Sequence, residues 1–364
     1  MTLHYGLIGC GMMGHEHIAN IRLLEDTQVS VIYEPNASMA ASAAKNAPDA
    51  VMASSLEALL AHKPLDALVI TSPNYLHVEQ LEAITQRVDL PILCEKPLYT
   101  DQNDSHRIAQ IKNTYKAPIW VAMEYRYMPP IARFIEQVSE STGGVKLLSI
   151  VEHRFPFLPK INNWNRFNAQ TGGTFVEKCC HFFDLMRHIL NSDPVRVMAS
   201  AGQEVNHLTE RYDGRSADIW DCGYVICDFA NGARAMLELS MFAEGEPYQE
   251  KVHAVGHKGK LEALVPGPAR FWPDKLGPAP TPKLITSPRH PKGPIVIEVP
   301  VDHAILGAGD HNGATYYQHQ KFRDVVAGLG PVEVSLDDGA WAVRMGLAAQ
   351  KSATTGQSVA LTLF

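Results

Sequence analysis

The sequence predicts an α/β fold with a doubly wound parallel Rossmann sheet, followed by an α+β fold with a mostly antiparallel open sheet and helices on one face. Three observations predict this division. A glycine motif follows the first apolar strand, short apolar strands alternate with helices up to residue 123, and longer strands with a hairpin signal come afterwards. We therefore expect an NAD-binding domain at residues 1–123 and a domain for substrate binding and oligomerisation at residues 124–364.

The glycine motif covers residues 7–14, where Gly9, Gly11 and Gly14 have the spacing G-x-G-x-x-G. Gly9 permits a tight turn, Gly11 lets a pyrophosphate approach the backbone, and Gly14 allows the next helix to pack closely on the strand. That helix begins near Met12 and Met13, and its N-terminus offers N–H groups to phosphates. The motif therefore predicts a dinucleotide site.

The second strand, residues 29–33, ends at Glu34. An acidic residue at this position can accept hydrogen bonds from both ribose hydroxyls of NAD, and it repels the additional phosphate of NADP. NAD is therefore the predicted cofactor.

Two further strands of the first domain end in polar motifs. Residues 66–71 lead into Ser72-Pro73-Asn74, and residues 91–94 lead into Glu95-Lys96-Pro97. The carboxyl ends of parallel strands share one edge of the sheet, so these motifs should ring one crevice with Gly9 and Glu34. A lysine there can hydrogen-bond a substrate oxygen and share its proton.

Together these motifs resemble the Gfo/Idh/MocA oxidoreductase family, which includes glucose–fructose oxidoreductase and inositol dehydrogenase. The resemblance rests on the glycine motif, on Thr-Ser-Pro-Asn-x-x-His at residues 71–77, and on the more specific Glu-Lys-Pro at residues 95–97. It implies that Lys96 lies beside the nicotinamide and the reacting hydroxyl. The cofactor contacts that we expect besides the glycine loop and Glu34 are Ser72, Pro73, Asn74, His77, Glu95 and Lys96.

The second domain is predicted mainly from longer strands, at residues 145–154, 195–205, 218–229, 233–242 and 251–255. Asn231-Gly232 is a strong signal for a two-residue hairpin. Residues 266–294 hold nine of the 24 prolines, and we assign them no regular structure. Helices at 314–327 and 337–354 and a strand at 358–364 should close the chain. The resemblance extends to this ending, and it implies a homodimer or homotetramer formed through the open face of the sheet.

A helix after Gly172-Gly173 carries the second group of candidate residues, with Thr174 as its expected N-cap. Its helical spacing gives an apolar stripe and a polar stripe, the latter formed by Glu177, His181, Asp184 and His188. A solvated amphipathic face is the alternative. The resemblance implies that His181 is the general acid/base on the substrate hydroxyl, Glu177 its acidic neighbour, and Asp184 a structural partner.

The sequence departs from the family pattern beside that histidine. Glu177 replaces the usual aspartate, Cys179 replaces a glycine, and Lys178 stands where family members tend to be apolar. If Lys178 points into the crevice, it favours a negatively charged substrate. The further substrate-binding candidates are Arg126, Arg154, Trp164 and Arg166, and a surface position is the alternative for the three arginines. We expect no metal, because adjacent cysteines 179 and 180 point about 100° apart on a helix.

The function predicted first is an NAD-dependent oxidoreductase that acts on a secondary hydroxyl of a neutral or anionic sugar derivative, with Lys96 or His181 taking the proton. One alternative is a redox-neutral NAD-dependent glycoside hydrolase, acting through transient C3 oxidation, elimination, water addition and re-reduction on an acidic or sulfonated glycoside such as a sulfoquinovoside. A non-catalytic NAD-dependent regulator is the third.

Composition narrows the partners. The net charge of −7 argues against a nucleic-acid surface, and no apolar run is long enough for a membrane span. The first strand begins too early to leave room for a signal peptide, and six cysteines without disulfide-like spacing fit a reducing compartment. We therefore expect a cytoplasmic enzyme with a small-molecule carbohydrate substrate.

Overall fold

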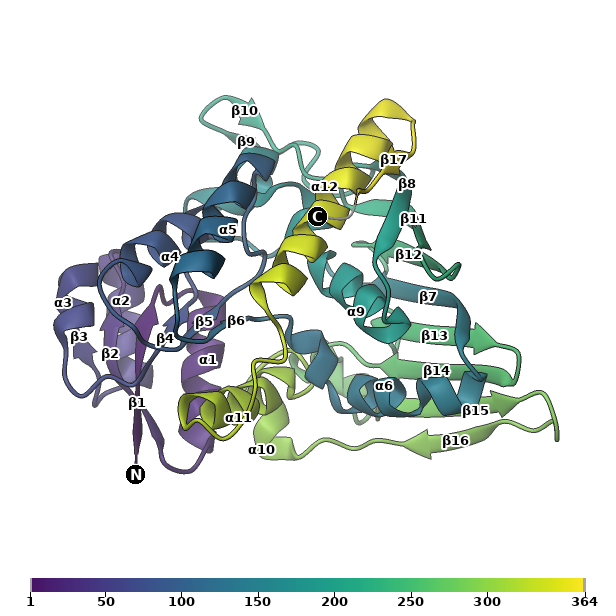
Figure 1. Cartoon of the computed structure of the whole chain (residues 1–364), viewed down its shortest axis with the longest axis horizontal. Helices are drawn as coiled ribbons and strands as arrows, with labels where there is room; N and C mark the ends of the chain where they lie inside the picture. The colour runs from purple at the N-terminus through teal and green to yellow at the C-terminus, as the bar shows by residue number, and fades with distance from the viewer. Residues whose placement is uncertain (1, 363–364) are drawn as a thin grey trace.

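The computed structural model describes residues 2–362, whose two large sheets lie side by side with their helices (Figure 1). The first sheet is parallel and has the order β3-β2-β1-β4-β5-β6. Its strands are β1 Leu3–Ile8, β2 Thr27–Tyr33, β3 Val51–Met52, β4 Ala67–Ile70, β5 Ile92–Cys94 and β6 Ile119–Val121. Its helices are α1 Met12–Leu23, α2 Ala37–Asn46, α3 Leu56–Ala61, α4 His77–Thr85 and α5 Ser105–Thr114.

This order confirms the doubly wound Rossmann prediction. The chain runs outward from β1 to β3 and then returns to place β4 on the other side of β1. Crevices form where the winding direction reverses, outside the carboxyl ends of the strands. The four residues of β4 are all buried, as expected for a strand covered on both faces.

The second sheet has nine strands in the order β16-β15-β14-β13-β7-β12-β11-β8-β17. These are β7 Val145–His153, β8 Pro194–Gly202, β11 Cys222–Phe229, β12 Arg234–Ser240, β13 Glu250–Gly256, β14 Gly259–Val265, β15 Lys283–Pro288, β16 Ile295–Glu298 and β17 Val359–Ala360. Only β7 and β12 pair in parallel among the neighbours described. The mostly antiparallel sheet is therefore confirmed. A hairpin at Asn231-Gly232 joins β11 and β12 as predicted, but its loop, residues 230–233, is longer than the two residues expected.

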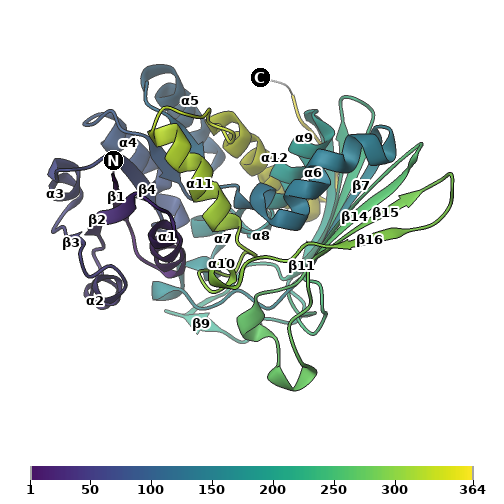
Figure 2. The same ribbon diagram turned by 90° about the horizontal axis from the view of Figure 1, so that it is seen from below.

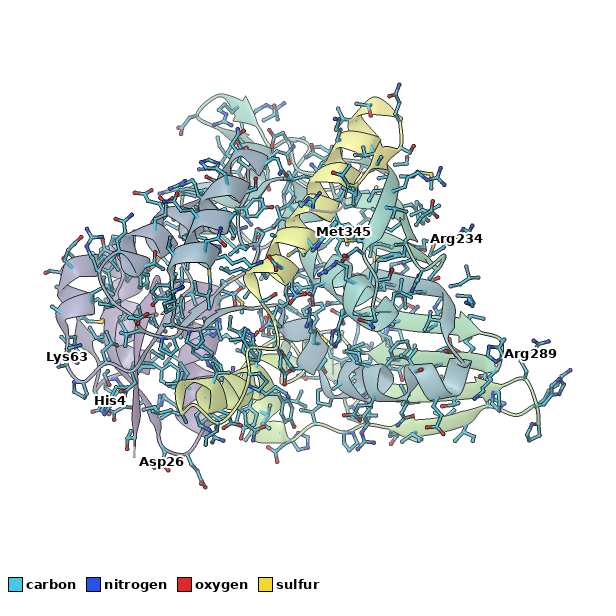
Figure 3. All side chains as sticks on the ribbon, viewed as in Figure 1. His4, Asp26, Lys63, Arg234, Arg289 and Met345 are labelled. Carbon is cyan, nitrogen blue, oxygen red and sulfur yellow. The ribbon has the colours of Figure 1, made fainter. Side chains whose placement is uncertain are left out.

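The helices of this half are α6 Pro129–Thr142, α7 Asn168–Thr171, α8 Thr174–Glu177, α9 Cys180–Leu190, α10 His303–Leu306, α11 Ala314–Val326 and α12 Leu336–Thr355, and a small sheet pairs β9 Arg211–Tyr212 with β10 Arg215–Ser216. Figure 2 shows α6, α9 and α12 on one side of the large sheet. Helix α12 also packs on β6 and α5 of the first sheet. Its Met345 is fully buried, whereas Arg234 and Arg289 lie at the outer edge of the molecule (Figure 3).

The proline-rich segment differs from the prediction, because β15 lies within residues 266–294. Only one residue of that strand is buried, so its side chains carry little pattern. Backbone pairing with β14 and β16 forms the strand instead. The predicted last strand at 358–364 is reduced to β17, and residues 363–364 lie outside the described part of the chain.

The helix after Gly172-Gly173 also differs from the prediction. It is divided into α8 and α9 at Lys178 and Cys179. Thr174 is not an N-cap, because its hydroxyl donates to the carbonyl oxygen of Trp220. The solvated-face alternative is wrong for Glu177, His181 and Asp184, which are all buried. Of the predicted polar stripe, His188 is exposed.

No helix within residues 2–362 combines the length and the apolar character that crossing a bilayer requires.

Candidate active site

A cleft of about 730 Å³ opens at the carboxyl ends of the parallel strands. The glycine loop forms one wall of this cleft, and the loops after β2, β4 and β5 complete it. The predicted cofactor residues that line it are Gly9, Gly11, Met12, Met13, Glu34, Ser72, Pro73, Asn74, Glu95 and Lys96. The structure therefore brings together the motifs that the sequence places up to 87 residues apart, from Gly9 to Lys96.

The backbone of this cleft fits a dinucleotide. Gly9 has φ +86°, and a Cβ atom there would lie 2.7 Å from the backbone nitrogen of Ser72. A Cβ atom on Gly11 would meet only the side chain of Met39, at 3.6 Å, so this part of the loop is open to a phosphate. The Glu34 carboxylate accepts hydrogen bonds from the backbone N–H groups of Cys10 and Asn36, at 2.7 and 2.8 Å. These bonds hold it at the rim of the cleft.

Two predicted cofactor residues lie behind the cleft surface. A Cβ atom on Gly14 would stand 2.8 Å from the carbonyl oxygen of Gly9, so this glycine serves packing between the helix and the loop. His77 is buried, and its ring nitrogens contact the carbonyl oxygens of Pro97 and Ser72 at 2.8 and 3.1 Å. His77 therefore joins the loops after β4 and β5, a structural role that corrects the predicted cofactor contact.

A second cleft, of about 770 Å³, adjoins the first. Lys96, Met12, Met13, His15 and Lys160 line both. The second cleft also contains all three predicted catalytic side chains, because Glu177 and His181 line it together with Lys96. The α8–α9 segment of the second sheet's half thus faces the Glu-Lys-Pro loop of the Rossmann half.

Lys96 is held at this junction by the backbone of α8. Its Nζ donates to the carbonyl oxygen of Glu177 at 3.0 Å, and its own backbone N–H donates to the carboxylate of Glu95 at 3.2 Å. Burial disfavours the charged ammonium, but the nearby carboxylates, Glu177 foremost, outweigh it and raise the pKa of Lys96. Lys96 is therefore a cation at neutral pH.

The Glu177 carboxylate is buried between donors from both halves of the chain. It accepts a hydrogen bond from Nδ2 of Asn74 and lies 3.7 Å from Nζ of Lys160. Burial opposes its ionisation, yet Lys160 and Lys96 together lower the pKa of Glu177 below its usual range. Glu177 is therefore a fixed negative charge rather than a proton donor.

His181 stacks on the ring of Tyr125, with centroids 4.0 Å apart and ring planes at 8°. Its Nδ1 is buried and has no hydrogen-bond partner among residues 2–362. Burial, reinforced by the cations Lys96 and Lys178, holds the pKa of His181 well below the usual range. The imidazole is therefore neutral at physiological pH and can accept a proton.

Cationic side chains form one wall of the second cleft. The Nζ of Lys178 lies 2.7 Å from the Glu152 carboxylate and donates to the hydroxyl of Tyr125. Arg154 lies 3.9 Å from the same carboxylate and stacks on Phe155. Both cations line the cleft, as the sequence predicts.

Two other predicted substrate residues point elsewhere. Arg126 forms a buried two-pronged ion pair with Asp184, which gives Asp184 the structural role expected for it. Arg166 is buried and pairs with Glu210 at 3.0 Å. Neither lines the clefts, so their assignment to the substrate is corrected. Trp164 lines the first cleft instead, which we call the cofactor cleft because its backbone fits a dinucleotide. The Nζ atom of Lys160 lies 4.6 Å from the centroid of the Trp164 ring.

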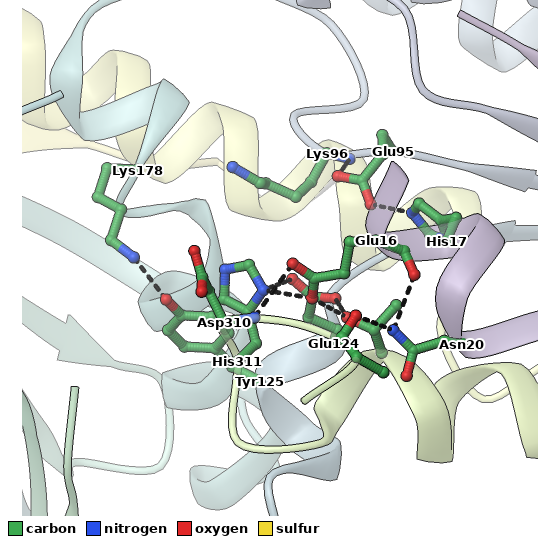
Figure 4. A network of polar contacts seen from close by, with 12 residues as sticks. Glu16, His17, Asn20, Glu95, Lys96, Glu124, Tyr125, Lys178, Asp310 and His311 are labelled. Carbon is green, nitrogen blue, oxygen red and sulfur yellow. Dashed lines mark hydrogen bonds and ion pairs between the residues drawn. The ribbon is translucent and has the colours of Figure 1, made fainter. Parts of the chain in front are cut away.

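Several cleft residues escaped the sequence analysis. Tyr125, directly before Arg126, carries the ring that supports His181, and Lys160 lies at the boundary of the two clefts. Glu16, Glu124 and His311 lie close together in the same wall (Figure 4). No local motif marks them, because they come from segments that meet only in the folded chain.

Comparison with known proteins agrees with this architecture. The family model "Oxidoreductase family, NAD-binding Rossmann fold" matches residues 3–123, and "Oxidoreductase family, C-terminal alpha/beta domain" matches residues 136–361. The chain belongs to the Gfo/Idh/MocA oxidoreductase family. The resemblance expected from the sequence is thereby confirmed, as is NAD as the cofactor of its Rossmann domain.

Named relatives in this family act on polyols and sugars. The chain is 28% identical over 275 residues to inositol 2-dehydrogenase of Corynebacterium glutamicum strain R. The aligned region covers 75% of this chain and 77% of that protein. Among solved structures, levoglucosan dehydrogenase in complex with NADH and levoglucosan has a TM-score of 0.80 at 20% identity, with 99% of each chain covered. A myo-inositol dehydrogenase from C. glutamicum ATCC 13032 has a TM-score of 0.74 at 23% identity, with 100% of each chain covered. The sequence matches make this chain an NAD-binding oxidoreductase with sugar-dehydrogenase relatives; the two structures bear on its fold alone.

Proposed function

We propose that this protein oxidises a secondary hydroxyl of a sugar derivative that carries a negatively charged group. The observation that carries the proposal is the convergence of Lys96 and His181 on a cleft that adjoins the dinucleotide cleft and has Arg154 and Lys178 in its wall. Bound NAD would supply the hydride acceptor for the carbon that bears the hydroxyl.

The protonation states divide the roles of the two catalytic side chains. Neutral His181 accepts the hydroxyl proton as the general base. Cationic Lys96 donates a hydrogen bond to the same oxygen and stabilises the negative charge that develops on it. One of the three ammonium hydrogens is already bonded to the carbonyl of Glu177, which leaves the others for the substrate. Glu177 acts as a positioning residue by fixing this ammonium and that of Lys160.

The proposal that the substrate is anionic rests on the charge balance of the cleft wall. Glu152 compensates only one of the two cations Lys178 and Arg154, and burial raises the pKa of the neighbouring Glu250 to about 7. The wall therefore carries excess positive charge whenever Glu250 is protonated. A carboxylate or sulfonate on the substrate would neutralise that charge.

A redox-neutral NAD-dependent glycoside hydrolase is the second candidate, with an acidic or sulfonated glycoside such as a sulfoquinovoside as substrate. It uses the same base and cation in transient oxidation, elimination, water addition and re-reduction. One observation favours it: residues 159–162 and Trp164, from the second domain, line the cofactor cleft, so both domains would contact bound NAD and retain it. A non-catalytic regulator ranks last, since it has no need for Lys96 and His181 in one cleft.

One assay separates these candidates. The purified protein receives NAD and a panel of neutral and acidic free sugars alongside the matching nitrophenyl glycosides, while NADH absorbance and nitrophenol release are followed together. Growth of NADH on a free acidic sugar supports the dehydrogenase. Nitrophenol release without net NADH supports the hydrolase. NAD binding without turnover on any panel member would contradict both.

We also propose that the chain forms a homodimer or homotetramer through the open face of the large sheet. Leu147 on β7 and Tyr224 and Ile226 on β11 are exposed there. A Tyr224→Lys variant should shift the mass measured by light scattering toward the monomer. An unchanged mass would place the contact elsewhere.

A further inference from the structure

A cluster of three ionisable side chains lies in the wall of the second cleft, which is the proposed substrate cleft. This cluster has no part in the chemistry described above. Glu16 comes from α1, Glu124 follows β6, and His311 precedes α11. One ligand atom from each lies within 4.8 Å of the others, and all three line the cleft with Lys96 and His181. In Figure 4, Tyr125 lies between this cluster and Lys178.

The hydrogen bonds of the cluster indicate which of its carboxyl groups carries a proton. The Thr315 hydroxyl lies 2.7 Å from a carboxyl oxygen of Glu16 and 2.7 Å from one of Glu124. A hydroxyl has one proton, so it can donate to only one of them. The second contact needs a proton on a carboxyl group, and burial together with neighbouring carboxylates raises the pKa of Glu124. A protonated Glu124 can donate to Thr315, which then donates to Glu16.

His311 balances the remaining charge. Its Nδ1 lies 2.9 Å from Glu16 and 3.5 Å from Glu124. Burial opposes its protonation, but these two carboxyl groups outweigh burial and raise the pKa of His311 to about 9. The cluster thus holds one carboxylate, one carboxylic acid and one imidazolium. It is electrically balanced without a metal ion.

A neutral polar cluster in a cleft wall suits a hydroxyl ligand. Glu16 already accepts from His311, Thr315 and the backbone N–H of Asp310. Within residues 2–362, the second oxygen of Glu124 accepts no hydrogen bond, and the Nδ1 atom of His311 stands 3.5 Å from it. This oxygen therefore retains capacity to accept. A carbohydrate hydroxyl can donate to that oxygen and also accept from the imidazolium.

We infer that Glu16, Glu124 and His311 form a second polar subsite of the cleft, which binds a substrate hydroxyl other than the one that is oxidised. The inference rests on the proposed function and specifies its substrate as a polyhydroxylated molecule held at two places. Since Glu16 belongs to the Rossmann domain and His311 to the second domain, the substrate would contact both domains.

A purely structural clamp between the domains is the competing explanation, and the chain contains a matched control for it. Asn20 lies one turn after Glu16 on α1, and its Nδ2 donates to the carbonyl oxygen of Ala308 at 3.1 Å. This bond joins the same two segments, yet Asn20 does not line the cleft. Asn20→Ala therefore removes this clamp contact, together with the bond from Nδ2 to the backbone carbonyl oxygen of Glu16 at 2.8 Å, and leaves all three side chains of the inferred subsite in place.

The test measures calorimetric affinities of the NAD-loaded protein for myo-inositol, D-glucose and D-glucuronate, each compared with its monodeoxy analogues. The Glu16 carboxylate helps to keep His311 protonated, so Glu16→Gln weakens the imidazolium donor of the subsite. For at least one parent sugar, this variant should therefore weaken binding about tenfold or more, while leaving the affinity for one deoxy analogue unchanged. Asn20→Ala should change the affinities for the parent sugar and for its deoxy analogues by the same factor. If Glu16→Gln does not fold, His311→Gln takes its place with the same expectation.

Several outcomes would overturn the inference. These are equal losses for a parent and all its analogues, the same pattern in Asn20→Ala, no binding of any probe by the wild type, or a stoichiometric divalent ion that Glu16→Gln loses. If Glu16→Gln weakens binding of a parent sugar but not of its deoxy analogue, and no sugar is turned over, the subsite is supported and the proposed function is contradicted.

Discussion

The two clefts of this protein are adjoining and similar in volume, but they are built from different parts of the chain. Consecutive residues of loops after parallel strands form most of the cofactor cleft, and backbone groups and glycines supply its recognition surface. Side chains from α1, η3 (Glu124–Tyr127), the loop after β7, α8, α9 and the segment before α11 line the second cleft, the proposed substrate cleft. A dinucleotide site is thus a local property of the chain, whereas the substrate site is a property of its packing.

The ionisable groups differ in the same way. Glu34 is the charged group that the sequence assigns to the ribose, and it is held by two backbone donors. The substrate cleft holds Lys96, Glu177, Lys178 and His181, all with pKa values shifted by burial and by one another. A mutation in the first cleft should therefore affect only the contact that it removes. A mutation in the second cleft should also change the pKa values of neighbouring groups.

Arg126→Ala is expected to have the largest effect, and it acts on stability. It leaves Asp184 buried without its cation, so the free energy of unfolding should fall by about 3–5 kcal/mol. Denaturant unfolding measures the loss. Arg196→Ala, which breaks the more exposed pair with Asp228, should cost at most about 1 kcal/mol. If Arg126→Ala unfolded like the wild type and only raised KM, Arg126 would be a substrate residue after all.

Lys96→Ala and His181→Ala should each lower kcat by on the order of a hundredfold or more, because each removes a group that acts on the reacting oxygen. NAD affinity, followed by fluorescence titration, should be largely retained. Lys112→Ala is a matched control, since that lysine is exposed and pairs with Asp337 away from both clefts. Full activity of either site variant would remove that residue from the mechanism.

Glu34→Ala should weaken NAD binding about tenfold or more by removing a charged acceptor for ribose hydroxyls. Discrimination against NADP should relax as well, because the repulsion of its phosphate is lost. Calorimetric titration with both cofactors checks this. Substrate affinity should not change, since Glu34 lines only the cofactor cleft. Unaltered affinity and selectivity would show that Glu34 lies outside the ribose site.

The smallest effect is a pH dependence from Glu250, which burial and Glu152 drive toward protonation, with a pKa of about 7. Glu152, Lys178, Arg154 and Gln249 face it. Below that pH Glu250 is neutral and the wall is more positive; above it the added negative charge opposes an anionic substrate. KM for such a substrate should rise about threefold to tenfold between about pH 6 and pH 8. Glu250→Gln should flatten the profile; an unchanged slope would exclude Glu250 as its source.

Much of the candidate site follows from short motifs. The glycine loop, Glu34 and the Glu-Lys-Pro tripeptide each follow a strand, and parallel strands end at one edge, so their meeting is a consequence of fold class. His181 and Lys178 were also located from a short stretch around Gly172-Gly173. Arg126 and Arg166 were misplaced, because proximity along the chain does not decide whether a side chain turns toward a cleft or toward a buried carboxylate.

The sequence by itself determined the Rossmann half, NAD as the cofactor and the mostly antiparallel character of the second sheet, since each depends on local spacing and periodicity. Lys96 and His181 were singled out through the family resemblance, and the structure brings them into one cleft. Only the tertiary structure decided that Tyr125 supports His181, that Lys160 lies between the clefts, and that Glu16 meets His311 across 295 residues. The physical reason is that charge states and side-chain directions are set by burial and by neighbours distant in the chain, and these exist only after the two sheets have packed together.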